Sequence, residues 1–267
     1  AEEINRLVLG VESRILECIS KRTELSITLF NVAQNADDQQ RGLKFLDAMG
    51  KIFPQNHLSR KVLISENPPR AIMEEVRKDY DLLVVGATQS TTNTSALFNP
   101  ITDELLRFAP CPAMIVHGGH VSMDWRPRRV LIPTNGARAS RRAAEVGFAV
   151  APEADVEVII LKVVQTRYGK DYLPENATWE QSHMKIAGEI VGELREFGQL
   201  LGVPTAGEVR KGMDIADVIL DVAREENIDL IVLGTNIRVG SDRLYLGPKV
   251  EHILSDAPCP VVVVNAE

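Results

Sequence analysis

Residues 229–266 read DLIVLGTNIRVGSDRLYLGPKVEHILSDAPCPVVVVNA, and residues 81–118 read DLLVVGATQSTTNTSALFNPITDELLRFAPCPAMIVHG. The two stretches align without a gap, so that Asp81 lies against Asp229 and Cys111 against Cys259. Each runs from an aspartate through an apolar segment, a glycine, a polar loop and a helix opened by proline to the letters APCP and a second apolar segment. The chain is therefore predicted to be an internal duplication.

The second copy alternates apolar runs with helical patterns. Unbroken runs of Val, Ile and Leu are typical of strands that are covered on both faces of a parallel sheet. We expect strands at 130–133, 156–164, 207–210, 228–233 and 261–264, and helices at 137–151, 179–201 and 215–226, with a proline-started helix before the last strand. This alternation predicts an α/β fold class with two doubly wound, parallel, five-stranded sheets of Rossmann-like type.

The first copy opens with an amphipathic helical pattern between residues 4 and 19. Aligning 25–32 with 156–163 leaves no room for the first strand of this copy, and it places an insertion in the second copy around 166–181. We expect a first domain at 1–118 that lacks its first strand, a linker at 119–128 and a second domain at 129–267. A cut in a longer polypeptide is the favoured explanation, and a first copy that does without the strand is the alternative.

Charge and composition narrow the classes of partner. The 267 residues carry a net charge of −7, which gives no general attraction for nucleic acid or anionic membranes. Six arginines nevertheless crowd one short stretch: Arg126, Arg128, Arg129, Arg138, Arg141 and Arg142. We interpret them as a solvated linker and helix face, with phosphate or partner contact as the alternative. No apolar run is long enough to span a bilayer. The three cysteines have neither metal-ligand nor redox spacing, which indicates buried thiols in a reducing, cytoplasmic compartment.

Motifs for other chemistries are missing or weak. The sequence has no Walker loop, no GxGxxG after a strand and no GxSxG elbow. His117 and His120 of HGGH lack carboxylates or thiols at ligand spacing, so we assign them to a linker, and we predict no metal beyond a Mg²⁺ carried by a nucleotide. His57, His183 and His252 are interpreted as surface or satisfied residues. No nucleophile and base accompany the glycine-bearing loop, so we predict no enzyme, with slow nucleotide hydrolysis as the minor alternative.

A ligand site is expected where two strands of the second copy end. In open parallel sheets, ligands bind beyond the carboxyl ends of the strands, at the point where the strand order reverses. The turn PTNG at 133–136 and the loop that starts at Gly234 both follow such ends. Small residues let backbone N–H groups approach a phosphate, and the N-terminus of a following helix favours an anion. A glycine after a strand is also the ordinary sign of a plain turn, which stays open as the alternative.

Three segments of the chain resemble the universal stress protein family in a tandem form. They are VLIPTNG at 130–136, DLIVLGT at 229–235 and LGPKVEHILSDAPCPVVVV at 246–264. The resemblance covers the second copy from residue 129 to residue 266 and the first copy from its first helix to about residue 118. It implies that the closing strands, 113–116 and 261–264, pair antiparallel, so that the two copies form a pseudo-dimer within one chain. A homodimer of chains is a further option.

Nucleotide-binding members of the family carry Gly, two residues, Gly, nine residues, Gly and then Ser or Thr. Gly234 and Gly247 fit the first and last glycines, whereas Ile237 and Pro248 replace the second glycine and the hydroxyl residue. Pro248 removes a backbone donor, although proline is favoured as the first residue of a helix. The first copy has these residues in the corresponding places: Gly86, Gln89, Asn99 and Pro100. We expect the first copy to bind no nucleotide in the usual way.

The resemblance implies an adenine nucleotide as ligand, namely ATP, ADP, AMP or a cyclic nucleotide. The residues implied to hold it are Pro133, Thr134, Asn135, Gly136, Val163, Gly234, Thr235, Arg238, Gly240, Ser241, Gly247, Pro248, Lys249 and Val250. Asn135 stands where the family usually has aspartate, and it offers contacts to adenine or ribose.

These features indicate a regulatory module that binds an adenine nucleotide or related second messenger. A ligand would act by shifting loop conformations and thereby controlling an attached or partner protein. The tandem module resembles the C-terminal tails of secondary transporters, notably cation/proton antiporters and amino-acid-type permeases. This implies a cytoplasmic module, or one held at the cytoplasmic face of the inner membrane by an upstream transporter. A ligand-free dimerisation scaffold with degenerate loops is the alternative.

Overall fold

The computed structural model describes residues 2–53, 57–87, 98–118, 125–151, 155–166, 174–236 and 244–265. The first copy contains α1 (Glu2–Ser20), β1 (Ile27–Ala33), α2 (Ala36–Met49), the short 3-10 helix η1 (Gly50–Ile52), β2 (Leu58–Ile64), α3 (Pro68–Val76), β3 (Leu83–Ala87), α4 (Pro100–Phe108) and β4 (Ala113–His117). The second copy contains β5 (Arg129–Pro133), α5 (Arg138–Val150), β6 (Glu157–Gln165), α6 (Pro174–Leu200), β7 (Thr205–Gly212), α7 (Ile215–Glu225), β8 (Leu230–Thr235), α8 (Pro248–Asp256) and β9 (Val261–Asn265). Helix and strand alternate in both copies, as the sequence predicts.

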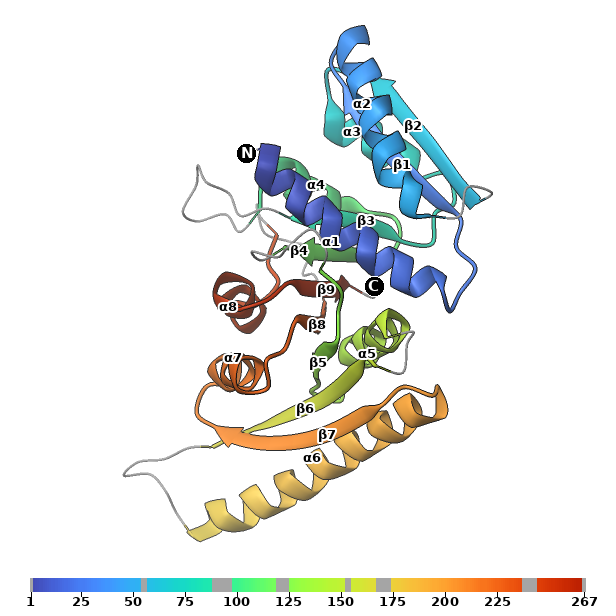
Figure 1. Ribbon diagram of the computed structural model, residues 1–267. Helices are drawn as coiled ribbons and strands as arrows, with labels where there is room; N and C mark the ends of the chain where they lie inside the picture. The colour runs from blue at the N-terminus through green and yellow to red at the C-terminus, as the bar shows by residue number, and fades with distance from the viewer. Residues whose placement is uncertain are drawn as a thin grey trace.

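The described strands form one seven-stranded sheet, in the order β3-β4-β9-β8-β5-β6-β7, and a separate pair, β1-β2 (Figure 1). Neighbouring strands are parallel. The exception is the pair β4 and β9, which runs antiparallel with Met114 opposite Val264 and Val116 opposite Val262. The predicted α/β fold is confirmed, and the closing strands of the two copies pair as the family resemblance implies.

The strands of the first copy do not lie in one continuous sheet. In the second copy, β5 lies between β6 and β8. Among the described residues, no strand takes the corresponding place between β1 and β3. The four strands of the first copy therefore divide, so that β3 and β4 extend the sheet of the second copy while β1 and β2 stand apart. Instead of two separate sheets, the first of them short of one strand, the described strands form one joined sheet and a separate pair.

Two apolar cores cover opposite faces of the large sheet and run through both copies. One core lies under α4, α7 and α8 and includes Leu106 and Ile253. The other lies under α1, α5 and α6 and includes Ile15 and Phe148. Figure 1 shows α7 and α8 on one side of the second copy and α5 and α6 on the other, which is the doubly wound arrangement. A third, small core around Leu46 joins α2 to β1 and β2.

Several element boundaries differ from the sequence expectations. Helix α6 begins at Pro174, ahead of the predicted start at 179, and so takes in part of the inserted segment. Strand β7 extends beyond the predicted 207–210 because it pairs with β6 along its whole length. No helix in the described ranges combines the length and the apolar composition that a bilayer crossing demands.

The cysteines are buried, and none forms a disulfide. Burial raises the pKa of the Cys259 thiol to about 12, and burial also raises the pKa of Cys111. A thiol held in its neutral form is a poor nucleophile and a poor metal ligand. The interpretation of the cysteines as small buried apolar residues is confirmed.

Asp229, just before β8, anchors the start of β5. Its carboxylate accepts hydrogen bonds from the backbone N–H of Arg128 at 2.9 Å and of Arg129 at 3.2 Å, and its own N–H donates to the Arg129 carbonyl at 3.0 Å. The Arg129 side chain in turn pairs with Glu157 at 3.2 Å and Glu226 at 3.0 Å. Burial raises the pKa of Asp229, and the amide donors of Arg128 and Arg129 oppose that shift. This contact fixes β5 against β8.

We predict that Asp229→Ala lowers the free energy of unfolding by about 1–3 kcal/mol, because two backbone N–H groups at the start of β5 lose their acceptor. Urea unfolding followed by circular dichroism measures the loss. Asp221→Ala is the matched control, since Asp221 pairs with Arg224 on the exposed face of α7 and its removal should lower stability by less than about 0.5 kcal/mol. Equal losses in the two variants would contradict the anchoring role.

Glu12 on α1 is a buried carboxyl group. Its Oε1 atom has no hydrogen-bond partner within the described part of the chain, and burial raises the pKa of Glu12 to about 8. The folded protein therefore holds a proton on Glu12 at pH values where the unfolded chain, with an ordinary pKa near 4.5, has released it.

We predict that stability falls as the pH rises from about 4.5 to about 8, because the native state binds more protons than the unfolded state in that window. Glu12→Gln should remove this slope and raise the free energy of unfolding by roughly 3 kcal/mol at pH 7. Chemical unfolding at a series of pH values makes the measurement. Glu104→Gln, on the exposed face of α4, is the control and should retain the slope of the parent protein. A parent protein without the slope would refute the assignment.

Candidate functional site

The strand order of the second copy reverses at β5. From β5 the chain continues outward to β6 and β7 and then returns to β8 and β9 on the other side. Ligands bind beyond the strand ends at such a reversal in open parallel sheets. The turn at 133–136 follows β5 and the loop from Gly234 follows β8, so the structure brings the two predicted segments to the same edge of the sheet.

Thr134 holds the turn after β5 in place. Its side chain is buried, and its N–H donates to the Leu161 carbonyl on β6 at 2.8 Å. Its Oγ1 accepts a hydrogen bond from the N–H of Gly136 at 3.1 Å and lies 3.1 Å from the Ser140 hydroxyl. Gly136 has φ of +83°, which favours glycine. Thr134 therefore supports the turn, and Pro133, buried at the end of β5, does the same.

Asn135 is exposed at the tip of this turn, and its side-chain oxygen already accepts two hydrogen bonds from within the chain. Oδ1 accepts the N–H of Ala137 at 2.9 Å and the Ser140 hydroxyl at 2.9 Å. Because a backbone N–H must meet an oxygen, this contact fixes which side-chain atom is Oδ1 and leaves the amide NH₂ as the outward group. A family aspartate would present a carboxylate here, whereas Asn135 presents a donor.

Gly234 is required by packing. A Cβ atom at this position would lie 2.1 Å from the Ala139 carbonyl oxygen and 2.6 Å from the Ser140 nitrogen, both in the first turn of α5. The first signature glycine thus lets α5 rest directly on β8, whether or not a ligand is bound. Thr235 is likewise committed to the fold, since its buried hydroxyl donates to the Leu246 carbonyl at 3.1 Å and ties β8 to the segment before α8.

Gly247 leaves the start of α8 open. It occupies the N-cap position with φ of +95°, and a Cβ built there meets nothing within 4 Å. Pro248 is the first residue of α8, as expected, so the first free N–H groups of the helix belong to Lys249 and Val250. Within the described part of the chain no side chain caps these two donors, and they form the kind of helix N-terminus that binds anions.

The matching position in the first copy is closed. Asn99 caps α4, because its side-chain oxygen accepts the N–H of Thr102 at 3.0 Å. The donor that the second copy leaves open is therefore satisfied within the first copy. This difference supports the expectation that only the second copy binds a nucleotide.

A side chain of the first copy reaches the loop of the second. Asp103 on α4 accepts the backbone N–H of Leu244 at 2.7 Å, and Leu244 and Leu246 are buried in the core under α4, α7 and α8. The end of the loop between β8 and α8 is thus fixed by both copies. No sequence pattern pointed to Asp103, because the two partners lie 141 residues apart.

Lys162 adds positive charge at the same edge. It lies near the carboxyl end of β6, half-buried, and burial lowers its pKa, as does the neighbouring positive charge of Lys249. Two lysines close enough to repel each other favour an anion between them. The sequence does carry a signal for Lys162, which is the single charged residue in the strand IILKVV, although we did not predict it.

At the candidate site, Val163 is available through its backbone groups rather than its side chain. Its side chain is buried in the core, whereas its peptide groups face the β5 side, like those of Leu161. Since β5 ends at Pro133, opposite Leu161, no residue of β5 pairs with Val163. Three further predicted site residues, Arg238, Gly240 and Ser241, lie outside the described residues.

Comparison with known proteins places this site in context. The profile of the Universal stress protein family matches residues 10–117 and 127–265. The chain belongs to this family. It is 32% identical over 141 residues to universal stress protein MJ0531 of Methanocaldococcus jannaschii, across 52% of this chain and 82% of that protein. Over 225 residues it is 29% identical to the universal stress protein E homolog of Haemophilus influenzae, across 79% of this chain and 71% of that protein.

A solved structure shows the same fold over both copies. The crystal structure of a universal stress protein from Archaeoglobus fulgidus matches with a TM-score of 0.62 and 16% sequence identity. The match covers 95% of this chain and 94% of that one. Two universal stress domains in tandem are therefore shown by sequence and by fold.

Most of the clustered arginines of this universal stress protein are engaged in ion pairs. Arg141 pairs with Glu193 on α6 at 3.0 Å, and Arg142 pairs with Glu145 at 2.7 Å. These contacts, with those of Arg129, agree with the interpretation of a solvated helix face. They also turn Arg141 toward α6.

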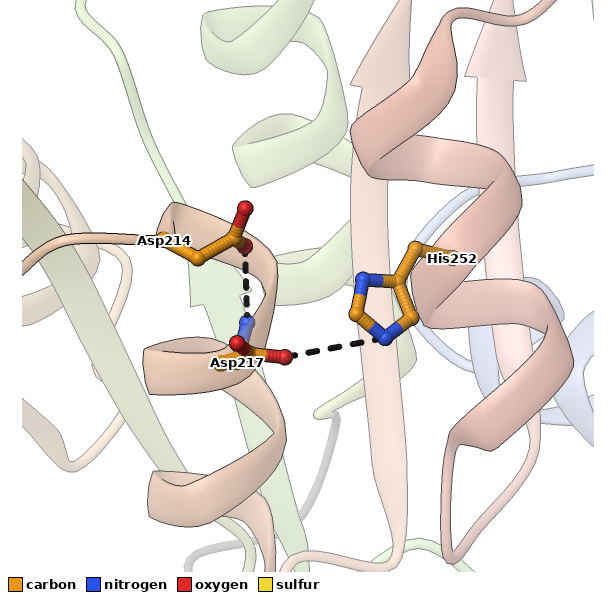
Figure 2. A group of neighbouring side chains, drawn as sticks. All are labelled: Asp214, Asp217 and His252. Carbon is orange, nitrogen blue, oxygen red and sulfur yellow. Dashed lines mark hydrogen bonds and ion pairs between the residues drawn. The ribbon is translucent and has the colours of Figure 1, made fainter.

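One group of side chains has the composition of a metal site. Figure 2 shows Asp214 and Asp217 at the start of α7 facing His252 on α8, with one ligand atom of each within 4.8 Å of the others. Asp214 already caps α7 by accepting the N–H groups of Ala216 and Asp217. His252 Nε2 lies 3.6 Å from Asp217 and 3.1 Å from Asp256. These contacts account for the group as an exposed network that ties α7 to α8, and His252 is a satisfied surface residue.

We predict that Gly234→Ala destabilises the protein by about 3 kcal/mol or more, because its Cβ would enter the backbone of α5. Gly188→Ala is the control, since Gly188 lies exposed in α6 with nothing near its Cβ, and this change should stabilise the protein by about 0.5–1 kcal/mol. Urea unfolding compares both with the parent. A fully stable Gly234→Ala protein would mean that α5 does not contact β8 as described.

Proposed function

We propose that the second copy binds an adenine nucleotide, or a related second messenger, and that its binding state controls an attached or partner protein. One observation carries the proposal. The N-terminus of α8 is open at Gly247, while the equivalent helix of the first copy is capped by Asn99. An uncapped helix start leaves its first N–H groups to water or to a ligand, and an anion binds favourably at such a start.

The phosphate end of the ligand has a defined set of donors. The N–H groups of Lys249 and Val250 point out of the start of α8, and the side chains of Lys162 and Lys249 supply charge. The dipole of α8 adds to the attraction. These groups take over the role that the family signature gives to its second glycine and its Ser or Thr, which Ile237 and Pro248 replace in this chain.

The nucleoside end lies on the other side of the strand reversal. The NH₂ group of Asn135 is placed to donate to a ribose hydroxyl or a base nitrogen, and the backbone of Val163 offers one donor and one acceptor to a base edge. Backbone donors and acceptors can recognise adenine without the help of a dedicated side chain. This site would bind the nucleotide and would not catalyse a reaction of it.

Regulation requires two states that a ligand distinguishes. The loop between β8 and α8 carries the phosphate donors at one end and is held by Asp103 of the first copy at Leu244. A ligand that orders this loop would therefore act on α4 and on the joined sheet. The controlled protein is assigned by resemblance to tandem regulatory tails, and a membrane transporter is the class proposed.

We predict that ATP, ADP, AMP, cyclic AMP or cyclic di-AMP raises the melting temperature of the protein, because a ligand that binds the native state stabilises it. Differential scanning fluorimetry at millimolar ligand makes the measurement. Gly247→Asn should abolish the shift, because a side chain at this N-cap, where φ is +95°, strains the start of α8 and covers its donors. Lys162→Met should weaken binding about tenfold through the loss of a charge-assisted contact.

Lys185→Gln serves as the control, because Lys185 is exposed on α6, and it should keep the full shift. The melting temperatures of the unliganded variants show whether each one folds. No shift with any of the five nucleotides would refute the binding proposal and favour the scaffold alternative. The pairing of β4 with β9 already joins the two copies, as a scaffold requires.

A further inference from the structure

Helices α7 and α8 pack against each other, and three side chains with metal-ligating atoms meet where they touch. Asp214 is the N-cap residue of α7 and Asp217 lies in the first turn of that helix. His252 faces them from α8 (Figure 2). One ligand atom of each residue lies within 4.8 Å of the other two. Two carboxylates and an imidazole, carried by two separate helices, are thus directed at one point.

The negative charge of this network is not balanced by the basic residues around it. Within the described ranges, no lysine or arginine pairs with Asp214, Asp217 or Asp256. Asp217 and Asp256 share His252 as their ion-pair partner. Three carboxylates around one imidazole repel one another, so a bound cation would lower the electrostatic energy of the network.

Each of the three facing side chains has a ligand atom to offer. Oδ1 of Asp214 accepts the N–H groups of Ala216 and Asp217, which fixes this carboxylate and leaves its second oxygen without a hydrogen bond among the described residues. Oδ1 of Asp217 lies 3.6 Å from Nε2 of His252, which is too far for a hydrogen bond. Nε2 becomes a metal ligand when the ring carries its proton on Nδ1.

The separations suit a small ion after a modest movement of exposed side chains. Bonds of about 2.0–2.2 Å in a tetrahedral Zn²⁺ site place the ligand atoms roughly 3.3–3.6 Å apart. The distance between Asp217 and His252 is already 3.6 Å. Their side chains are 62% and 39% exposed, so both can rotate toward a shared ion without disturbing the core.

We propose that Asp214, Asp217 and His252 bind one divalent transition-metal ion, of which Zn²⁺ is the type, and that this ion joins α7 to α8. The imidazole nitrogen favours Zn²⁺, whereas a set of oxygens alone would suit Mg²⁺ or Ca²⁺. The fourth position is open to water or to the carboxylate of Asp256, which lies 3.1 Å from Nε2 of His252. No ligand spacing in the sequence marks this site, because β8 separates the two helices along the chain. The site does not depend on nucleotide binding.

Isothermal titration calorimetry of the whole protein with ZnCl₂, after treatment with EDTA and dialysis, tests the proposal. We expect one saturable site per chain and a melting temperature that rises with Zn²⁺ concentration. His252→Gln and Asp217→Asn should each weaken Zn²⁺ binding at least about tenfold, because the loss of a ligand costs no less than the loss of a supporting contact.

Two further variants are matched controls. Asp221→Asn removes a carboxylate from the next turn of α7 that is already paired with Arg224. His183→Gln removes a histidine of α6 whose ring stacks on Trp179. Both variants should bind Zn²⁺ with the affinity of the parent. Melting temperatures measured in EDTA show whether each variant folds.

Three results would overturn the proposal. One is a titration without saturable binding of Zn²⁺. Another is an affinity of His252→Gln equal to that of the parent or of His183→Gln, since the ion would then bind elsewhere. The third is equal affinity for Mg²⁺, which would show that the carboxylates attract any cation by charge alone.

Discussion

The antiparallel pairing of β4 with β9 is the contact on which the rest of the molecule depends. Both strands are continuous apolar runs that would be exposed as sheet edges in isolated copies, and each covers the other. Their pairing turns two partial sheets into one and lets two apolar cores extend across the boundary between the copies. The first copy, which cannot close a sheet of its own, is held in place by this joint.

The duplication produced two halves with different tasks. The same helix start is capped by Asn99 in the first copy and left open by Gly247 in the second. A capped helix contributes its own stability, whereas an open one leaves donors for something else to satisfy. Divergence at a single N-cap residue therefore separates a copy whose helix start is capped from a copy whose helix start is open.

The sequence predicted the fold well because its signals are strong and local. Unbroken apolar runs, proline-started helices and the repeated APCP segments predicted the α/β fold, and the family resemblance implied the pairing of the closing strands. The alignment of the two copies predicted that the first copy lacks its first strand, and the division of its strands into two sheets follows from the missing central strand. The start of α6 was missed because the inserted segment has no counterpart in the first copy.

The sequence predicted which segments meet at the candidate site, but it did not predict what each residue does there. Strand ends and glycines pointed to the turn after β5 and the loop after β8, which meet at one edge of the sheet, yet Gly234 and Thr235 serve packing and loop closure there. Such roles depend on the close approach of α5 and on the Leu246 carbonyl, which a linear pattern does not show. Lys162 carried a readable signal as a lone charge in an apolar strand, whereas Asp103 carried none.

The hydrogen bond from Leu244 to Asp103 makes the two halves thermodynamically linked. Coupling between two sites is reciprocal, so whatever a nucleotide does to α4 through this bond, a molecule that moves α4 must do to nucleotide affinity by the same factor. Under the proposed function, the first copy can then set the nucleotide concentration at which the second copy responds. Changes in the first copy that never touch the ligand would adjust that threshold.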